Sequence, residues 1–245
     1  MPIQDSEIYE FVNNQIIYFH QTRIQKLQKV KLHNILKRKN PYLYRAKNII
    51  TGGELVKTIL DAYLSSQEET LFGEFLEKLA IFINQKVYGG IKSASVGIDL
   101  DFTKQNIRYL VSIKSGPNWG NSGQIEKMRN NFLKAKKILR TTGGTTHVEA
   151  VNGCCYGKDS NPDKGGYLKY CGQDFWEFIS GDSDLYLRII QPISNQAKQH
   201  NENFEEQYAR VINQFTEEFL DDYVDEGIID WDKLTQMNSG KASID

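Results

Sequence analysis

The chain has 245 residues, of which 40% are hydrophobic and 25% are charged, with 19 glycines and 5 prolines. This composition allows a full hydrophobic core and excludes disordered and collagen-like chains. The formal net charge is −1, and the 3 cysteines, two of them adjacent, exclude a disulfide framework and fit no zinc-site spacing.

The N-terminal part is helical in pattern and basic in charge. Its first segment, MPIQDSEIYE, lacks the basic and apolar regions of a signal peptide, and no apolar run in the chain approaches the ~20 residues that span a bilayer. We therefore expect no membrane contact. Apolar residues at helical spacing predict a helix from Ser6 to about Lys39, ending before Asn40-Pro41.

The basic charge of this part is one-sided. Between Phe11 and Gly53 there is no acidic residue. The same stretch contains Arg23, Lys26, Lys29, Lys31, Lys37, Arg38, Lys39, Arg45 and Lys47. Because such a block raises affinity for phosphates, we expect the region to contact nucleic acid, with Lys37, Arg38 and Lys39 as DNA contacts. A solvated helix face is the alternative.

Two helices are predicted next. A short one follows Thr51-Gly-Gly, and a second runs from Ser66 to about Gln85. In the second, Gly73 and Glu77 lie on one face. Since a glycine lets a helix approach a sheet closely, we expect Glu77 near the strand ends, although an ordinary exposed glutamate fits the same pattern.

Two or three strands are predicted between about Lys92 and Ser115, the last two forming a hairpin through a polar turn at 104–106. Alternation places Asp99 and Asp101 on one face, and likewise Ser112 and Lys114. The hairpin thus brings carboxylates and an ammonium together. Carboxylates that hold Mg²⁺ beside a lysine that positions water form an arrangement for cutting phosphodiester bonds. Asp101 is either a second ligand or a solvated hairpin acid.

A polar loop and a helix from about Gln124 to Leu139 follow. Helix N-termini offer free amides to phosphates, so we expect Asn118, Asn121 and Gln124 to hydrogen-bond DNA and Trp119 to support the loop. A structural turn and N-cap is the alternative for each. A buried strand from His147 to Tyr156 completes the order helix, strands, helix, strand. This order predicts an α/β fold with a mixed sheet.

The remaining segments are a polar loop and further helices. Residues 158–169 offer Asp159, Asn161 and Lys164 for base contacts. Helices are predicted at 174–179, up to Gln191-Pro192, and in a long amphipathic stretch that Gly227 stops. The four histidines show no metal spacing and the cysteines no partnered histidine, so we interpret both as structural.

An acid on one strand followed by acid-x-lysine on the next resembles the PD-(D/E)XK nucleases. Longer segments resemble type II restriction endonucleases, specifically the PmeII-like group and relatives that cut at GG…CC cores. These segments are LFGEFLEKLA, YLVSIKSGPNW, VNGCCYG and YCGQDFWEFISG. The resemblance covers roughly Glu68 to Trp231. It implies a PD-(D/E)XK core at 66–180, a mixed sheet flanked by helices, with helical additions at 1–65 and 181–245.

The resemblance also implies roles for individual residues. Asp99 is the expected metal-binding acid, Lys114 the catalytic lysine and Glu77 the helix acid. Ser112 stands where the family pattern has Asp or Glu, which removes one negative charge from the site; Glu77 or Asp101 is expected to compensate. The Ile113 carbonyl completes the expected ligands of Mg²⁺, for which Mn²⁺ is able to substitute.

The leading hypothesis is a type II restriction endonuclease that cuts both strands of a short palindromic DNA site. We expect a homodimer on double-stranded DNA, in a prokaryotic cytoplasm, with a cognate methyltransferase gene nearby. Two alternatives stay open. One is a structure-selective or repair nuclease of the same superfamily, and the other is a DNA-binding module that does not cleave, which Ser112 favours.

Overall fold

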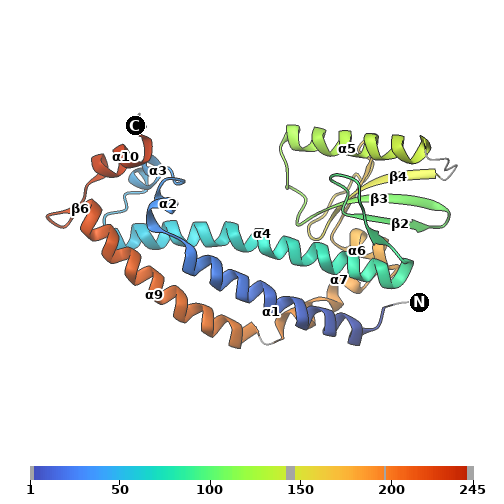
Figure 1. Ribbon diagram of the computed structural model, residues 1–245, viewed down its shortest axis with the longest axis horizontal. Helices are drawn as coiled ribbons and strands as arrows, with labels where there is room; N and C mark the ends of the chain where they lie inside the picture. The colour runs from blue at the N-terminus through green and yellow to red at the C-terminus, as the bar shows by residue number, and fades with distance from the viewer. Residues whose placement is uncertain (1–2, 142–146, 196, 242–245) are drawn as a thin grey trace. The chain divides into compact units, whose positions relative to one another are not determined.

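The chain is helical towards both ends and carries its main β-sheet in the middle (Figure 1). The computed structural model describes residues 3–141, 147–195 and 197–241. The helices are α1 (Asp5–Lys29), α2 (Leu32–Leu36), α3 (Pro41–Ala46), α4 (Gly52–Tyr88), α5 (Ser122–Thr141), α6 (Gln173–Ser180), α7 (Leu185–Arg188), α8 (Ile190–Ser194), α9 (Ala197–Tyr223) and α10 (Trp231–Ser239). The strands are β1 (Ile91–Lys92), β2 (Leu100–Lys104), β3 (Ile107–Lys114), β4 (His147–Cys154), β5 (Leu168–Cys171), β6 (Val224–Asp225) and β7 (Ile228–Ile229). Within the described ranges, no helix combines the length and apolar character that crossing a bilayer requires.

The contacts divide the chain into two units. The sheet unit contains Met1–Ile17 and Leu71–Asn195, and the helical unit contains Tyr18–Thr70 and Gln196–Asp245. Helices α1 and α4 each contribute residues to both. The division at 65 and 180 that the sequence suggests stays a prediction.

The five-stranded sheet is mixed, which confirms the predicted α/β class. Its strand order is β1-β2-β3-β4-β5, with β1, β2 and β3 antiparallel and β3, β4 and β5 parallel. Because β3 and β4 run in the same direction, their carboxyl ends at Lys114 and Cys154 are paired at one edge of the sheet. Strand β5 was not predicted from the sequence.

The turn between β2 and β3 fixes the register of the hairpin. Gln105 and Asn106 both have positive φ, 51° and 63°, as a two-residue hairpin loop whose twist matches the flanking strands requires. The strands then pair from Lys104↔Ile107 to Leu100↔Val111. Asp99 lies one residue before β2, and its N–H donates to the Val111 carbonyl at 2.8 Å. The register therefore places Asp99 opposite Ser112.

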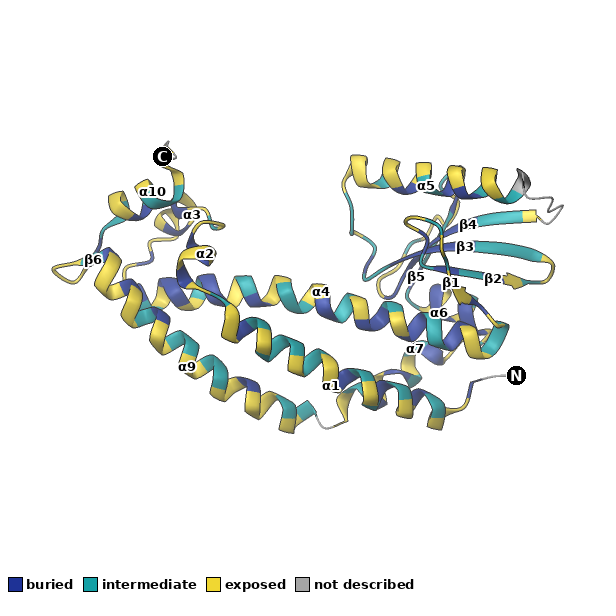
Figure 2. Cartoon of the chain, viewed as in Figure 1, coloured by how far each residue is buried: buried dark blue, intermediate teal, exposed yellow. Residues whose placement is uncertain are grey.

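Helices cover both faces of the sheet (Figure 1). Met128, Phe132 and Ala135 of α5 pack over Leu110 and Ala150, and the outer side of α5 is exposed (Figure 2). The opposite face is aromatic: Phe102 and Tyr109 contact Phe178 of α6, at 5.4 and 5.0 Å between ring centroids. Gly153 is needed there, because a Cβ at this position would meet the Phe175 ring at 2.1 Å.

The helical unit has a core of its own, built from two segments distant in sequence. Residues of α1, α2 and α4 pack with Phe204, Phe215 and Phe219 of α9 and with Leu234 of α10. After α9, β6 and β7 form a short hairpin whose turn residues Glu226 and Gly227 have positive φ.

Three helix boundaries predicted from the sequence are wrong. The single helix from Ser6 to about Lys39 is interrupted after Lys29, since α2 resumes the apolar spacing by burying Leu32, Ile35 and Leu36 in the same core. Conversely, α4 continues through Ser66, because no glycine or proline interrupts it between Gly53 and Gly73. Helix α9 ends at Tyr223, so Gly227 belongs to the β6–β7 turn and does not cap the helix. Apolar periodicity reports the buried side of a segment, not the continuity of its hydrogen bonds.

Candidate active site

The hairpin brings Asp99 and Lys114 together at the edge where β3 and β4 end. The Oδ2 atom of Asp99 accepts a hydrogen bond from the Ile113 N–H at 2.6 Å and from the Ser112 hydroxyl at 3.4 Å. The same oxygen lies 3.8 Å from the Lys114 Nζ. Both charged side chains keep partial access to solvent, 21% for Asp99 and 29% for Lys114. A carboxylate and an ammonium thus lie side by side where a ligand has access to them.

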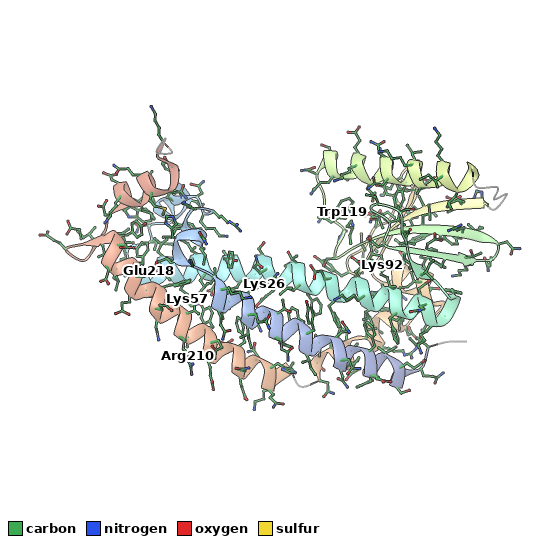
Figure 3. The ribbon with its side chains drawn as sticks, viewed as in Figure 1. Lys26, Lys57, Lys92, Trp119, Arg210 and Glu218 are labelled. Carbon is green, nitrogen blue, oxygen red and sulfur yellow. The ribbon has the colours of Figure 1, made fainter. Side chains whose placement is uncertain are left out.

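Lys114 is oriented by two further contacts. Its Nζ donates to the Ile113 carbonyl at 2.9 Å and lies 5.3 Å from the centroid of the Trp119 ring. Trp119 belongs to the loop between β3 and α5 (Figure 3). The face of an indole attracts a cation, so this ring stabilises the ammonium near Asp99.

Asn152 links this tryptophan to the sheet, and sequence reasoning missed it. The Trp119 Nε1–H donates to Asn152 Oδ1 at 3.0 Å, and Asn152 Nδ2 donates to the Ser112 carbonyl at 3.2 Å. Asn152 is buried on β4, directly beside Ser112 in the parallel register. An amide in the otherwise apolar segment AVNGCC was the available signal, since a buried amide requires polar partners.

The charges of Asp99 and Lys114 also act on Glu77. Burial raises the pKa of its carboxyl, the negative charge of Asp99 raises it further, and Lys92 and Lys114 act in the opposite direction. The Nζ of Lys92, a residue labelled in Figure 3, lies 3.8 Å from Glu77 Oε1. The close approach expected from Gly73 is present, since a Cβ there would lie 3.4 Å from the Ser115 Cβ. A cation bound beside both carboxylates would offset the effect of the Asp99 charge on Glu77.

Asp101 has a different partner. Its two carboxylate oxygens accept hydrogen bonds from Arg108 Nε at 2.9 Å and Nη2 at 2.7 Å. This bidentate pair bridges β2 and β3 within the hairpin. The structure brings Asp99, Ser112 and Lys114 together, places Glu77 within electrostatic range of Asp99 and Lys114, and leaves Asp101 with Arg108.

The donor set available for a metal ion consists of hard oxygen atoms. Among the residues that the structure describes, no group of three or more His, Cys, Asp or Glu side chains is arranged to hold a metal ion. The carboxylates of Asp99 and Glu77 and the Ile113 carbonyl are the candidate ligands. This set fits Mg²⁺, which is often bound through one or two carboxylates, water and substrate phosphate.

The loop after β3 mixes structural and free polar groups. Asn121 Oδ1 accepts from the Gln124 N–H at 3.0 Å, and Gln124 Oε1 accepts from the Asn121 N–H at 2.9 Å. This reciprocal pair is a capping box at the start of α5, so both side chains already stabilise the helix N-terminus. Asn118 is exposed.

The loop at 158–169 is held by ion pairs. Asp159 lies 2.9 Å from the Lys164 Nζ and 3.3 Å from the Lys169 Nζ, and these contacts keep the pKa of its carboxyl below the usual range. Lys169 also donates to the Pro117 carbonyl at 3.0 Å. Lys169 therefore links Asp159 to the loop that follows Lys114.

The cysteines and histidines fit structural roles. All three cysteines are buried, and burial raises the pKa of Cys154 to about 12, which leaves its thiol un-ionised at neutral pH. The rings of His20 and His200 stack at 4.5 Å between centroids, a pairing that their sequence spacing did not predict. Burial is the main cause that lowers the pKa of His20 to about 4, followed by the charges of His200 and Arg23.

Two comparisons with known proteins bear on this geometry. A search of curated proteins finds no match. The family model described as type II restriction endonuclease EcoO109I matches residues 6–201, which include most of the helices and the whole five-stranded sheet. The chain therefore belongs to the EcoO109I family of type II restriction endonucleases.

Proposed function

We propose that this protein hydrolyses phosphodiester bonds in both strands of a short palindromic DNA site, and that it needs Mg²⁺, for which Mn²⁺ is able to substitute. The observation that carries this proposal is the approach of Asp99 and Lys114 to 3.8 Å at one edge of the sheet, with Glu77 within electrostatic range of both. Family membership supports the reaction class, and the geometry supports the choice of residues.

The proposed metal ligands are Asp99, Glu77 and the Ile113 carbonyl. A divalent ion held there supplies Lewis-acid stabilisation of the charge on the phosphoryl oxygens. The Ile113 N–H and the Ser112 hydroxyl fix the direction of the Asp99 carboxylate. Asp101 was the other candidate for compensating Ser112. Because its carboxylate is occupied by Arg108, we assign the compensation to Glu77.

Lys114 has the proposed role of positioning the attacking water. Its ammonium is a hydrogen-bond donor that lies 3.8 Å from the Asp99 carboxylate and 5.3 Å from the centroid of the Trp119 ring. Water attacks phosphorus in line with the 3′-oxygen, the P–O3′ bond breaks, and the 3′-oxygen gains a proton. The products are a 5′-phosphate and a 3′-hydroxyl. The Lys114 charge neutralises part of the negative charge that develops on the phosphoryl group.

Recognition of DNA is proposed to need a homodimer. One site per protomer matches the two-fold symmetry of a palindromic site, and the PmeII-like resemblance suggests a GG…CC core. Asn118 and the α5 N-terminus, with Trp119, Asn121 and Gln124, are the proposed contacts near the scissile phosphate. Lys37, Arg38 and Lys39 are proposed contacts from the helical unit. A methyltransferase gene nearby is the expected genetic partner.

Plasmid digestion tests the proposal. Purified protein is incubated with plasmid and Mg²⁺, and the fragment ends are sequenced. Discrete fragments with 5′-phosphates at one repeated sequence are expected. Nicking without discrete bands would indicate a structure-selective or repair nuclease, and salt-sensitive binding without cleavage by Mg²⁺ or Mn²⁺ would indicate a DNA-binding module. Either result would overturn the proposal.

A pair of lysine variants assigns the chemistry. Lys114→Ala is expected to slow cleavage by at least ~100-fold, the scale of losing one charge-stabilising donor, while DNA binding changes little. Lys86→Ala is the matched control, because it removes the same charge from an exposed ion pair with Glu7 in the same unit. Normal cleavage by Lys114→Ala would show that the assignment of Lys114 is wrong.

A further inference from the structure

The helical unit contains a pocket with strongly basic walls. Its volume is about 300 Å³. The lining residues come from the end of α1, the connection to α2, α2 and the segment after it, and the middle of α4. They are Lys26, Lys29, Val30, Lys31, Asn34, Arg38, Tyr63 and Gln67. Four of these eight residues carry positive charge and none is acidic. All lie within the helical unit.

The four positive charges of the pocket have no acidic partner among the residues that the structure describes. In the described part of the chain, no carboxylate forms an ion pair with Lys26, Lys29, Lys31 or Arg38. The neighbouring Arg23 differs, because it pairs with Glu68 of α4 and its guanidinium lies over the Phe204 ring. Four like charges around one pocket repel each other, and an anion in the pocket would remove that cost.

Helix stability accounts for only part of this arrangement. Lys26 and Lys29 lie in the last turn of α1, where cations favour the helix dipole. Lys31 has no such benefit, since it is the residue immediately before α2 and makes no side-chain cap hydrogen bond. Arg38 lies beyond the end of α2. Two of the four cations are therefore explained by α1 and two are not.

We propose that this pocket binds a backbone phosphate of the DNA substrate, at a place separate in the chain from the catalytic residues. The proposal rests on the proposed function for the identity of the polyanion. The amides of Asn34 and Gln67 and the Tyr63 hydroxyl add neutral donors to the four cations. The basic stretch continues beyond the pocket to Lys47, without an acid between Phe11 and Gly53. A long basic stretch of chain matches a polyanion better than a single free phosphate.

The salt dependence of binding tests the pocket directly. The full chain is titrated with a fluorescent non-cognate duplex, in EDTA and over a series of salt concentrations. Each phosphate that the protein neutralises contributes about 0.9 to the slope of log Kobs against log salt. Lys29→Gln/Arg38→Gln changes two exposed side chains of a pocket proposed to hold one phosphate, so its slope is expected to be shallower by about 0.9.

A matched control separates this site from general charge effects. Arg210→Gln/Lys233→Gln removes one arginine and one lysine from exposed positions of the same unit, outside the pocket and the basic stretch (Figure 3 labels Arg210 and Lys26). Its slope and its cleavage of plasmid are expected to equal those of the wild type. Equal slopes for the wild type and the pocket variant would overturn the proposal.

Free phosphate is the competing occupant. Thermal melts with inorganic phosphate or a mononucleotide test it. A phosphate-dependent rise in Tm that the pocket variant loses, with an unchanged DNA slope, would assign the pocket to a free phosphate and overturn the DNA assignment. If the wild type does not cut DNA but the pocket variant still has the shallower salt slope, the endonuclease proposal is refuted and the pocket proposal is supported.

Discussion

Replacing Ser112 by Asp restores the acid that the nuclease pattern has at this position. Ser112 is buried, with 1% of its surface exposed, and its hydroxyl lies 3.4 Å from Asp99 Oδ2. A carboxylate there would add a third negative charge to a group that already contains Asp99 and Glu77. The substitution therefore tests whether these side chains form one electrostatic unit.

The geometry sets the size of the effect. Two unit charges 3.4 Å apart repel by about 5 kcal/mol at an effective dielectric constant of about 20, and by about 1 kcal/mol in bulk water. Asp99 is 21% exposed, so the cost lies between these limits, reduced by the Lys114 charge. For a chain of this length, each kcal/mol lowers Tm by about 2–4 °C. We expect a fall of at least ~2 °C for Ser112→Asp without metal.

Thermal unfolding measures the change. The wild type, Ser112→Asp and the neutral control Ser112→Asn are melted in EDTA and then with Mg²⁺ or Ca²⁺. The control has nearly the same size as the acid but no charge. We expect Ser112→Asp to melt below Ser112→Asn in EDTA and to gain more from the divalent ion, because it offers an additional ligand.

The opposite result would refute this reasoning. If the two variants melt together in EDTA, a carboxylate at position 112 does not interact with Asp99, and the proposed charge cluster is absent. If the divalent ion raises both melting temperatures equally, position 112 does not contribute to metal binding.

Three further predictions concern the neighbours of this group. The pKa of Glu77 is raised, chiefly by burial, so ionising its carboxyl costs more in the folded chain than in the unfolded chain. The contribution of neutral Glu77 to stability is therefore fully present below about pH 4 and is lost as the pH rises through the raised pKa. In EDTA, Glu77→Gln is therefore expected to melt above the wild type at pH 8 and close to it at pH 4; equal curves at both values would contradict the burial argument. Trp119→Leu removes a cation–π contact worth about 0.5–2 kcal/mol, so single-turnover cleavage is expected to slow by ~2- to 30-fold, and Trp119→Phe is expected to recover part of the rate. Asp101→Asn is expected to cost about 1 kcal/mol in a denaturant titration by breaking the pair with Arg108, whereas a loss of cleavage far beyond that of the control Lys86→Ala would return Asp101 to the metal site.

The part of the site that the sequence predicts depends on local rules. Strand alternation and a short polar turn are enough to bring Asp99 and Lys114 together in one hairpin, because both act over neighbouring residues; the register that places Asp99 opposite Ser112 comes from the structure. The same rules place Asp101 on the same side, but they do not include Arg108, whose guanidinium takes its carboxylate. Alternation indicates the direction of a side chain and leaves its partner open.

The missed features come from contacts between distant segments. Strand β5 is short and is defined by its pairing with β4, and Asn152 has a role only because Trp119 and Ser112 lie beside it. The helical unit likewise joins Tyr18–Thr70 with Gln196–Asp245. Local propensity carries no information about such pairings, since tertiary packing decides them.

The serine at position 112 changes the net charge that would surround a metal ion in this site. Two carboxylates, Asp99 and Glu77, lie near two ammonium groups, Lys114 and Lys92, so the formal charges of the group cancel. A divalent ion entering this neutral group gains less attraction than it would from three carboxylates. The scissile phosphate brings the missing negative charge with the substrate. We therefore expect DNA and the divalent ion each to strengthen the binding of the other. The metal ion, the site residues and the scissile phosphate would then assemble fully only in the DNA complex that is cleaved.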